Sequence, residues 1–352
     1  MTKVPIRPAV AALPAYQPGA RPSGRLVYKL SSNESPYPPL PGVIAAVADS
    51  AVDLNRYPTM LADELVGAVA RFHDLEPGQV AVGAGSVSVL AHILAAVAGE
   101  SDRVAYPWRS FEAYPILTGV TGAQSVQVPL GAGGRLDLTA LAKAVDESTR
   151  AVLVCSPNNP TGPAVRQDEF DAFMASVPDS LLVVLDEAYV EFVTDPEAVD
   201  GIGGLAKHPN LVVLRTFSKA YGLAGLRVGY ALGRPRVIEA IRAVTTPFSV
   251  SAMAELAAIT SLQLQDEMRR RVAEVVARRA FMYEGLVAQG WDLPEPQGNF
   301  VWLDLGVDSA PFADACRRAG VLVRPFPDQG VRVSVGEQEG AERFLEVAST
   351  WV

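Results

Sequence analysis

The feature that most constrains the fold is a series of short apolar runs that alternate with helical patterns between residues 80 and 214. Several runs are apolar at every position, as strands must be when helices cover both faces of their sheet. This alternation predicts an α/β fold with a mostly parallel sheet. The predicted strands are Val80–Val82, Arg103–Tyr106, Ser125–Val128, Ala151–Val154, Leu181–Leu185 and Leu211–Leu214.

After about residue 245 the pattern changes to a long amphipathic helix followed by three more candidate strands. The apolar stripe of the helix contains Met268, Val272, Val275, Met282 and Leu286, and the strands are Phe300–Leu303, Val321–Val323 and Val331–Val335. Such a segment is typical of a smaller α+β domain. We therefore expect an N-terminal arm over 1–29, a large domain over 55–245, and a small domain made of 30–54 and 246–352.

Composition excludes several classes of function. The 352 residues carry a formal net charge of -9, so no basic field exists to attract nucleic acid or an anionic membrane. Two cysteines and three scattered histidines argue against a disulfide framework and against a metal site. The N-terminus has no apolar signal core, and the stretch Val87–Ala98 is too short to span a bilayer. We expect a cytoplasmic protein.

Lys219 is the residue that most directly suggests chemistry. It follows the predicted strand Leu211–Leu214 and lies in the run Arg215–Arg227, which is rich in glycine and hydroxyl side chains. A lysine beyond a strand end, with hydroxyls beside it and Arg227 after it, suits a Schiff-base lysine with a phosphate-binding site next to it. Pyridoxal phosphate (PLP) needs this arrangement.

Three more polar segments each follow a predicted strand. Ligand sites in open α/β sheets lie at the carboxyl ends of the strands, so this placement matters as much as the residue types. Gly83–Ser88 precedes an apolar helix whose first N–H groups could bind a phosphate. The alternatives are a simple turn or a dinucleotide site, but Ser88 stands where the third glycine of a dinucleotide fingerprint belongs.

The other two segments are Ser156–Gly162 and Asp186–Tyr189. The first contains turn dipeptides, so it is either a β-turn or a loop whose Asn159 amide donates to a phenolate oxygen. Asp186 ends a buried strand, and a buried carboxylate needs a cation or a donor beside it. The pyridinium nitrogen of PLP would be such a partner; Mg²⁺ would be another, but the chain has no P-loop to accompany it.

These motifs together resemble the fold-type-I PLP-dependent aminotransferases, most closely the branch of histidinol-phosphate and aromatic amino acid aminotransferases. The resemblance covers nearly the whole chain and is carried by Asn159–Gly162, Asp186–Tyr189 and Ser218–Arg227. It implies a large domain with a mostly parallel seven-stranded sheet flanked by helices, a smaller α+β domain, PLP as the cofactor, and a homodimer.

The resemblance also implies a role for individual residues. Lys219 would form the Schiff base and move the proton, Asp186 would pair with the pyridinium nitrogen, and Tyr189 and Asn159 would bond the phenolate oxygen. Phe111 would stack on the ring. The phosphate would be held by Ser86, Val87, Thr216, Ser218 and Arg227, together with Tyr57 of the neighbouring subunit. The substrate would be bound by Arg332, Arg324, Asn159, Tyr16 and Trp108.

The substrate prediction depends on the segment Pro107–Tyr114. Histidinol-phosphate aminotransferases usually carry Pro-Thr-Tyr-x-x-Tyr here, whereas this chain has a tryptophan at 108 and a phenylalanine at 111, as in the aromatic branch. Trp108 would add apolar surface near the substrate ring or serve in core packing. We expect transfer of an amino group between phenylalanine or tyrosine and 2-oxoglutarate. Histidinol-phosphate transamination and a threonine-phosphate decarboxylase-like lyase are the alternatives.

Overall fold

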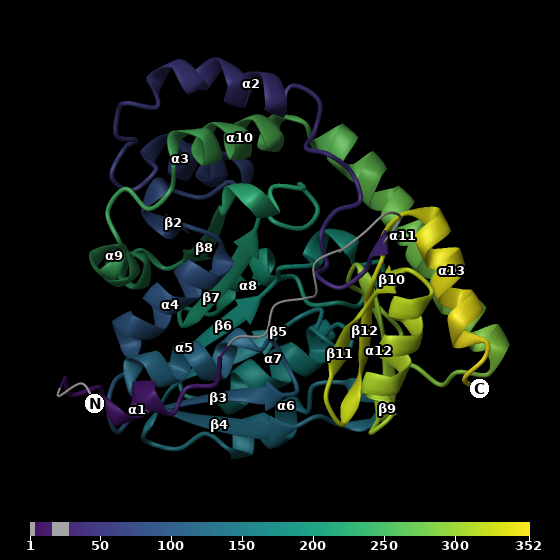
Figure 1. Ribbon diagram of the computed structural model, residues 1–352. Helices are drawn as coiled ribbons and strands as arrows, with labels where there is room; N and C mark the ends of the chain where they lie inside the picture. The colour runs from purple at the N-terminus through teal and green to yellow at the C-terminus, as the bar shows by residue number, and fades with distance from the viewer. Residues whose placement is uncertain (1–3, 16–27) are drawn as a thin grey trace.

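A seven-stranded sheet forms the centre of the computed structural model, which describes residues 4–15 and 28–352 (Figure 1). The strands run in the order β2-β8-β7-β6-β5-β3-β4; β8 is antiparallel to β2 and β7, and the other neighbouring pairs are parallel. Their bounds are β2 (Val80–Gly83), β3 (Arg103–Trp108), β4 (Gln124–Pro129), β5 (Thr149–Cys155), β6 (Leu182–Asp186), β7 (Leu211–Thr216) and β8 (Gly229–Gly233). The mostly parallel α/β sheet is thereby confirmed.

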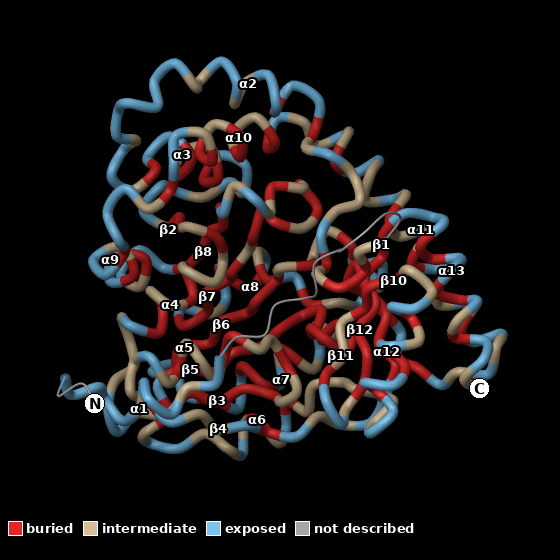
Figure 2. Tube along the Cα trace, viewed as in Figure 1, coloured by how far each residue is buried: buried red, intermediate tan, exposed pale blue. Residues whose placement is uncertain are grey.

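Both faces of this sheet are buried, which explains the continuously apolar strands. In β6, Val183 and Leu185 point into one hydrophobic cluster, whereas Leu182 and Val184 point into another. The first cluster includes side chains of α6 (Leu138–Lys143), α7 (Gln167–Ser176) and α8 (Gly201–Lys207). The second includes those of α4 (Ser86–Val97), α5 (Ala113–Thr121) and α9 (Pro235–Val244). Figure 2 shows the buried strands of the sheet surrounded by helices that are only partly exposed.

β8 is the strand of this sheet that the apolar runs did not indicate. It reads Gly-Tyr-Ala-Leu-Gly, and glycine has little preference for strands. Its pairing with β2 and β7 on either side buries all of its residues. The tertiary environment therefore sets its conformation.

A second, antiparallel sheet lies in the C-terminal part of the chain, in the order β11-β12-β9. It is formed by β9 (Phe300–Gly306), β11 (Arg324–Phe326) and β12 (Gln329–Ser334), and it is accompanied by α11 (Gln265–Gln289), α12 (Ser309–Arg318) and α13 (Gln338–Ala348). The predicted strand at 321–323 forms β10 (Val321–Leu322), which pairs with β1 (Tyr28–Lys29) and not with this sheet. Four members of the predicted stripe on α11 are buried: Met268, Val275, Met282 and Leu286.

The remaining helices lie at the N-terminal end and at the junction near residue 250. They are α1 (Pro8–Ala11), α2 (Val43–Ser50), α3 (Asp63–Phe72) and α10 (Ala252–Gln263), with short 3₁₀ turns at 51–53, 77–79, 132–134, 190–192 and 224–226. α10 packs against both α2 and α3 (Figure 1). The expected domain boundaries, including the assignment of 30–54 to the small domain, stay predictions. Among the described residues, no helix is long and apolar enough to cross a membrane.

Gly229 is a position where the packing of the sheet admits no side chain. A Cβ atom there would lie 2.5 Å from the Ser86 nitrogen and 3.0 Å from the Arg215 carbonyl oxygen. Both are backbone atoms, so Gly229→Ala must displace β7 or the start of α4. We expect it to lower the free energy of unfolding by about 1–3 kcal/mol, the usual cost of overpacking. Gly225→Ala is the control, because a Cβ atom there meets nothing within 4 Å; equal losses of the two variants in urea unfolding would contradict the steric role of Gly229.

Candidate active site

The polar segments after the strands meet in one cavity of about 230 Å³ at the carboxyl edge of the large sheet. β5, β6 and β7 each contribute the residues just beyond their ends, and α4 contributes its first turn after β2. The cavity is lined by the predicted residues Ser86, Val87, Phe111, Asn159, Asp186, Tyr189, Thr216, Ser218, Lys219 and Arg227, together with Ser32, Glu34, Cys155, Ala188 and Ala224. The expectation that these positions gather at one edge therefore agrees with the fold.

Lys219 faces this cavity from the turn after β7. Its Nζ atom lies 3.5 Å from the Ser32 carbonyl oxygen, to which it donates. Burial lowers the pKa of Lys219 to about 8, and the positive charges of Arg332 and Arg227 contribute to this lowering. The neutral, nucleophilic form of this amine is therefore a minor but far larger fraction near neutral pH than it is for an exposed lysine.

Asp186 lies on the floor of the cavity at the end of β6. Its Oδ2 atom accepts a 2.8 Å hydrogen bond from the Tyr114 hydroxyl, and its Oδ1 atom accepts one of 3.3 Å from the Ala188 N–H. Burial nevertheless raises the pKa of Asp186 to about 6. The site thus holds a carboxylate that a cation in the cavity would stabilise.

At the other end of the cavity, groups suited to an oxyanion converge. Ser86 and Val87 begin α4, whose first N–H groups have no partner within the helix. Arg227 reaches the Ser218 hydroxyl at 3.4 Å and the Ala224 carbonyl oxygen at 3.0 Å. Gly85 leaves room for this guanidinium, because a Cβ atom there would lie 2.5 Å from it.

Arg332 connects the second sheet to this cavity. It lies on β12 and is 8% exposed. Its Nη1 atom donates to Asn159 Oδ1 at 2.5 Å, and its Nη2 atom donates to the Ser31 carbonyl oxygen at 2.9 Å. Arg324, on the neighbouring strand β11, instead bonds the Glu112 carboxylate at 2.9 Å. Its charge is thus partly balanced within the chain.

Trp108, Tyr57 and Tyr16 differ from the other predicted residues. Trp108 lines an adjacent hollow of about 650 Å³, where the Arg109 guanidinium lies 4.4 Å from its ring. Tyr57 does not line the cofactor-sized cavity; it is 85% exposed and packs on Phe248. Tyr16 lies outside the described residues.

Comparison with known proteins identifies the protein family of this chain. Residues 26–347 match the family of class I and II aminotransferases. The chain belongs to this aminotransferase family. It is 50% identical over 348 residues to the aromatic amino acid aminotransferase of Streptomyces avermitilis, covering 98% of this chain and 97% of that one. The Thermobifida fusca aromatic amino acid aminotransferase is 51% identical over 349 residues, with 98% and 97% covered.

Solved structures agree with the family. The histidinol-phosphate aminotransferase of Sinorhizobium meliloti, in complex with pyridoxal-5'-phosphate, superposes with a TM-score of 0.88 at 27% identity, covering 99% of this chain and 98% of that one. A mutant of the aspartate aminotransferase of Thermus thermophilus gives 0.84 at 24% identity, with 99% of both chains covered, and supports the fold alone. The PLP-dependent aminotransferase fold is thus confirmed.

The aminotransferase cavity fits PLP, the cofactor of this family. A phosphate would meet the start of α4, the Ser218 hydroxyl and Arg227, and a ring nitrogen that carries a proton would meet Asp186. The raised pKa of Asp186 is an independent sign of the fit, because it marks a buried carboxylate whose charge lacks sufficient compensation from the protein.

Sequence reasoning missed several residues that line or support the cavity. Ser32, Glu34 and Cys155 line it, Tyr114 bonds Asp186, and Asn33 donates to Tyr189 at 3.0 Å. Tyr114 lies in the segment Pro107–Tyr114, but its spacing gives no sign that it reaches Asp186. The polar run 31–34, just before a proline-rich segment, was the available signal for Ser32, Asn33 and Glu34.

The titration of Asp186 should make the stability of the cofactor-free protein depend on pH. Its folded-state pKa of about 6 exceeds the ordinary 3.8, so the folded protein binds this proton more tightly than the unfolded chain. Its contribution to the free energy of unfolding therefore falls as pH rises from about 4 to about 6. We expect Asp186→Asn to stabilise the cofactor-free protein by up to about 3 kcal/mol above pH 6, and by little near pH 4.

Urea unfolding of both proteins at pH 4 and pH 7 measures this difference. A gain in stability as large at pH 4 as at pH 7 would show that the Asp186 carboxylate does not titrate in this way. Asp186→Asn should weaken cofactor binding although it stabilises the cofactor-free protein, because the amide has no negative charge to offer a protonated ring nitrogen.

Proposed function

We propose that this aminotransferase moves an amino group between an aromatic amino acid, phenylalanine or tyrosine, and 2-oxoglutarate, with PLP as cofactor. The observation that carries the proposal is the cavity that joins Lys219, Asp186 and the Arg332–Asn159 pair in one place. The aromatic preference is supported by the half-identical relatives from Streptomyces and Thermobifida, which are aromatic amino acid aminotransferases.

Each cavity residue has a chemical task in this proposal. PLP, when bound, withdraws electrons from the α-carbon of the amino acid. Lys219 would hold the cofactor covalently at Nζ, and the same atom would be placed to move the α-proton of the substrate as general base and acid. Asp186 keeps the ring nitrogen protonated, while Asn159 and Tyr189 bond the phenolate oxygen.

Five side chains and one backbone N–H would hold the cofactor in place. Among the residues that line the cavity, Ser86, Thr216, Ser218 and Arg227 would bind the phosphate with the N–H group of Val87, and Phe111 would stack on the ring. Together these contacts would hold the cofactor with its ring nitrogen toward Asp186 and within reach of Lys219.

Arg332 binds the α-carboxylate of the substrate in this proposal. A planar guanidinium can hold a carboxylate through two parallel bonds, and its contact with Asn159 aims it at the cavity. Arg324 assists, with Glu112 holding it in position. Aromatic surface is close by, since the ring of Phe326 lies 5.4 Å from the Arg324 guanidinium and 5.4 Å from the ring of Trp302.

Histidinol-phosphate transamination is the second candidate, because the Sinorhizobium enzyme with the same fold is a histidinol-phosphate aminotransferase. The arginines do not discriminate, since a guanidinium binds a phosphate ester as well as a carboxylate. Discrimination must come from the side-chain pocket. A pocket built to bond an imidazole leaves a polar group unpaired against a phenyl ring.

Single-turnover measurements on the holoenzyme separate the two candidates. We expect phenylalanine and tyrosine to bleach the absorbance of the bound cofactor at least about a hundredfold faster than histidinol phosphate. Lys219→Ala is the control and should show no conversion with any donor. Faster conversion of histidinol phosphate would assign the enzyme to histidine biosynthesis and overturn the aromatic preference.

We also propose that the enzyme is a homodimer in which Tyr57 reaches the cofactor phosphate of the partner. Support comes from Phe248, which is exposed and packs on Tyr57, and from further exposed apolar side chains in the chain segment 44–60: Ile44, Val52, Leu54 and Met60. A cluster of this kind is costly in water and suits a subunit interface. A cytoplasmic location goes with this proposal, and the two free, buried cysteines, Cys155 and Cys316, are compatible with a reducing compartment.

Hybrid dimers test the position of Tyr57. Tyr57→Phe should weaken cofactor binding about tenfold or more, because a hydrogen bond to a charged group is lost. In a hybrid with a Lys219→Ala subunit, one site contains Lys219 from the first subunit and an intact Tyr57 from the second. Activity at limiting cofactor should therefore recover after the two variants are mixed and allowed to exchange subunits. No recovery would place Tyr57 at its own subunit's site or remote from both.

A further inference from the structure

Residues 31–34, here called the bridging segment, run between the second sheet and the cofactor cavity. Its consecutive residues contact different functional groups. The Ser31 carbonyl oxygen accepts from Arg332 at 2.9 Å, and the Ser32 carbonyl oxygen accepts from Lys219 at 3.5 Å. The bridging segment therefore lies against both the substrate-binding arginine and the cofactor-binding lysine.

Asn33 is the best-anchored residue of the bridging segment. It is 1% exposed, and all of its polar groups have partners. Its side-chain Nδ2 donates to the Tyr189 hydroxyl at 3.0 Å, and its Oδ1 accepts from the Ser334 hydroxyl at 2.7 Å. Its backbone N–H donates to Ser334 Oγ at 2.8 Å, and its carbonyl oxygen accepts from Asn299 Nδ2 at 3.2 Å.

These contacts fix which way the Asn33 amide points. The Ser334 oxygen accepts from the Asn33 N–H, so the single proton of this hydroxyl is available for Asn33 Oδ1. With Oδ1 accepting from Ser334, the amide nitrogen faces Tyr189, as the structure has it. Asn33 is then a donor and Tyr189 an acceptor in this bond. The hydroxyl proton of Tyr189 is therefore free to point elsewhere.

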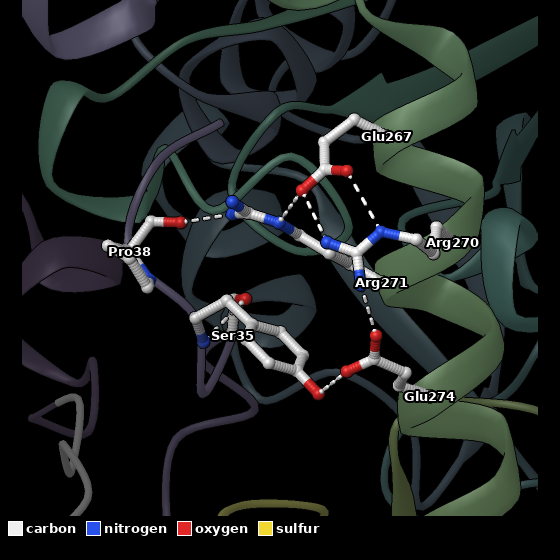
Figure 3. A network of polar contacts seen from close by, with 7 residues as sticks. Ser35, Pro38, Glu267, Arg270, Arg271 and Glu274 are labelled. Atoms are coloured by element: carbon white, nitrogen blue, oxygen red, sulfur yellow. Dashed lines mark hydrogen bonds and ion pairs between the residues drawn. The ribbon is translucent and has the colours of Figure 1, made fainter. Parts of the chain in front are cut away.

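The far end of the same loop is also tied down. Figure 3 shows Arg271 on α11 reaching the Pro38 carbonyl oxygen, a bond of 2.6 Å, beside the ion pairs of Glu267 with Arg270 and Arg271. Tyr37 donates to Glu274 on the same helix at 2.5 Å. The loop that contains Asn33 is thus held at the cavity and at α11, which limits how far the amide can move.

Ser334 links the Asn33 contact to the substrate side. It lies two residues after Arg332 on β12, so both side chains point to the same face of the strand. Arg332 bonds Asn159 and Ser334 bonds Asn33. One strand face therefore positions both residues expected at the phenolate oxygen of the cofactor: Asn159 directly and Tyr189 through Asn33.

We propose that Asn33 is a positioning residue that acts through Tyr189. Because the Asn33 amide donates to the Tyr189 oxygen, the hydroxyl proton of Tyr189 is directed to the phenolate oxygen of PLP. The inference rests on the proposed role of Tyr189. A donated proton stabilises the negative oxygen, so the linkage between the cofactor and Lys219 releases its own proton at a lower pH.

A purely structural role is the alternative, because Asn33 also ties the second sheet to the first. The two roles differ in what they change. The charged or titratable groups near Tyr189 are Arg332, Asp186, Cys155 and Lys219, and none of them is removed by a change at Asn33. A looser tie would reduce stability, whereas a misdirected hydroxyl would shift the spectrum of the bound cofactor.

The test is a pH titration of the visible absorbance of the holoenzyme, without substrate, in four proteins: wild type, Asn33→Gly, Tyr189→Phe and the double variant. Glycine suits this position, because Asn33 has a φ of 52°, in the left-handed region. Asp74→Gly is the matched control, since Asp74 has a φ of 54° and lies away from the cavity. Thermal unfolding of the cofactor-free proteins checks that each variant folds.

We expect Asn33→Gly to raise the midpoint by about one pH unit, a tenfold change in proton affinity, and Asp74→Gly to leave it unchanged. In the Tyr189→Phe background, Asn33→Gly should cause no further shift. If Asn33→Gly does not fold, Asn33→Asp replaces it. Its carboxylate accepts a hydrogen bond from the Tyr189 hydroxyl and should raise the midpoint at least as far as glycine does. In the Tyr189→Phe background the shift caused by Asn33→Asp should be smaller.

Three results would overturn the inference. An unchanged midpoint in Asn33→Gly, with a shift in Tyr189→Phe, removes the role of Asn33 and leaves that of Tyr189 intact. Equal shifts with and without the Tyr189 hydroxyl mean that Asn33 acts by another route. An unchanged midpoint in Tyr189→Phe removes the proposed role of Tyr189 and, with it, the inference. Amino transfer from phenylalanine, measured in parallel, reports separately on the proposed reaction.

Discussion

Burial of the large sheet on both faces is the constraint from which the active site follows. Strands such as β6 have no solvent-facing side, so their polar and ionisable side chains can occur only where the strands end. In a parallel sheet the carboxyl ends share one edge, and the residues that follow β5, β6 and β7 are brought together there. Asn159, Asp186 and Lys219 are far apart in the chain but line one cavity for this reason.

The second sheet completes this site by direct contact. Arg332 crosses from β12 to Asn159, and Ser334 on the same strand holds Asn33 against the cavity. In the proposed function, a substrate carboxylate would bind a guanidinium that already donates a hydrogen bond to the cavity residue Asn159. If Arg332 binds the substrate and Asn159 the cofactor, as proposed, these few hydrogen bonds link the two binding positions directly.

How much of this could be predicted depended on whether neighbours in space were neighbours in sequence. The strands of the large sheet and the residues Lys219, Asp186 and Asn159 were recognisable, because each lies within a few residues of an apolar run. Asn33 and Tyr114 were not, because their partners, Tyr189 and Asp186, lie 156 and 72 residues away. β8 was missed because its burial comes from β2 and β7 and not from its own glycine-rich sequence.

Burial also determines which group in the cavity can react as a nucleophile. Cys155 and Lys219 both line it, and a low dielectric favours the neutral form of each. For Cys155 the neutral form is the thiol: burial raises its pKa to about 12, so the reactive thiolate is scarce. For Lys219 the neutral form is the amine itself, and burial lowers its pKa to about 8. The same desolvation that suppresses the sulfur activates the nitrogen, so the cavity selects lysine for covalent chemistry without any contact dedicated to that choice.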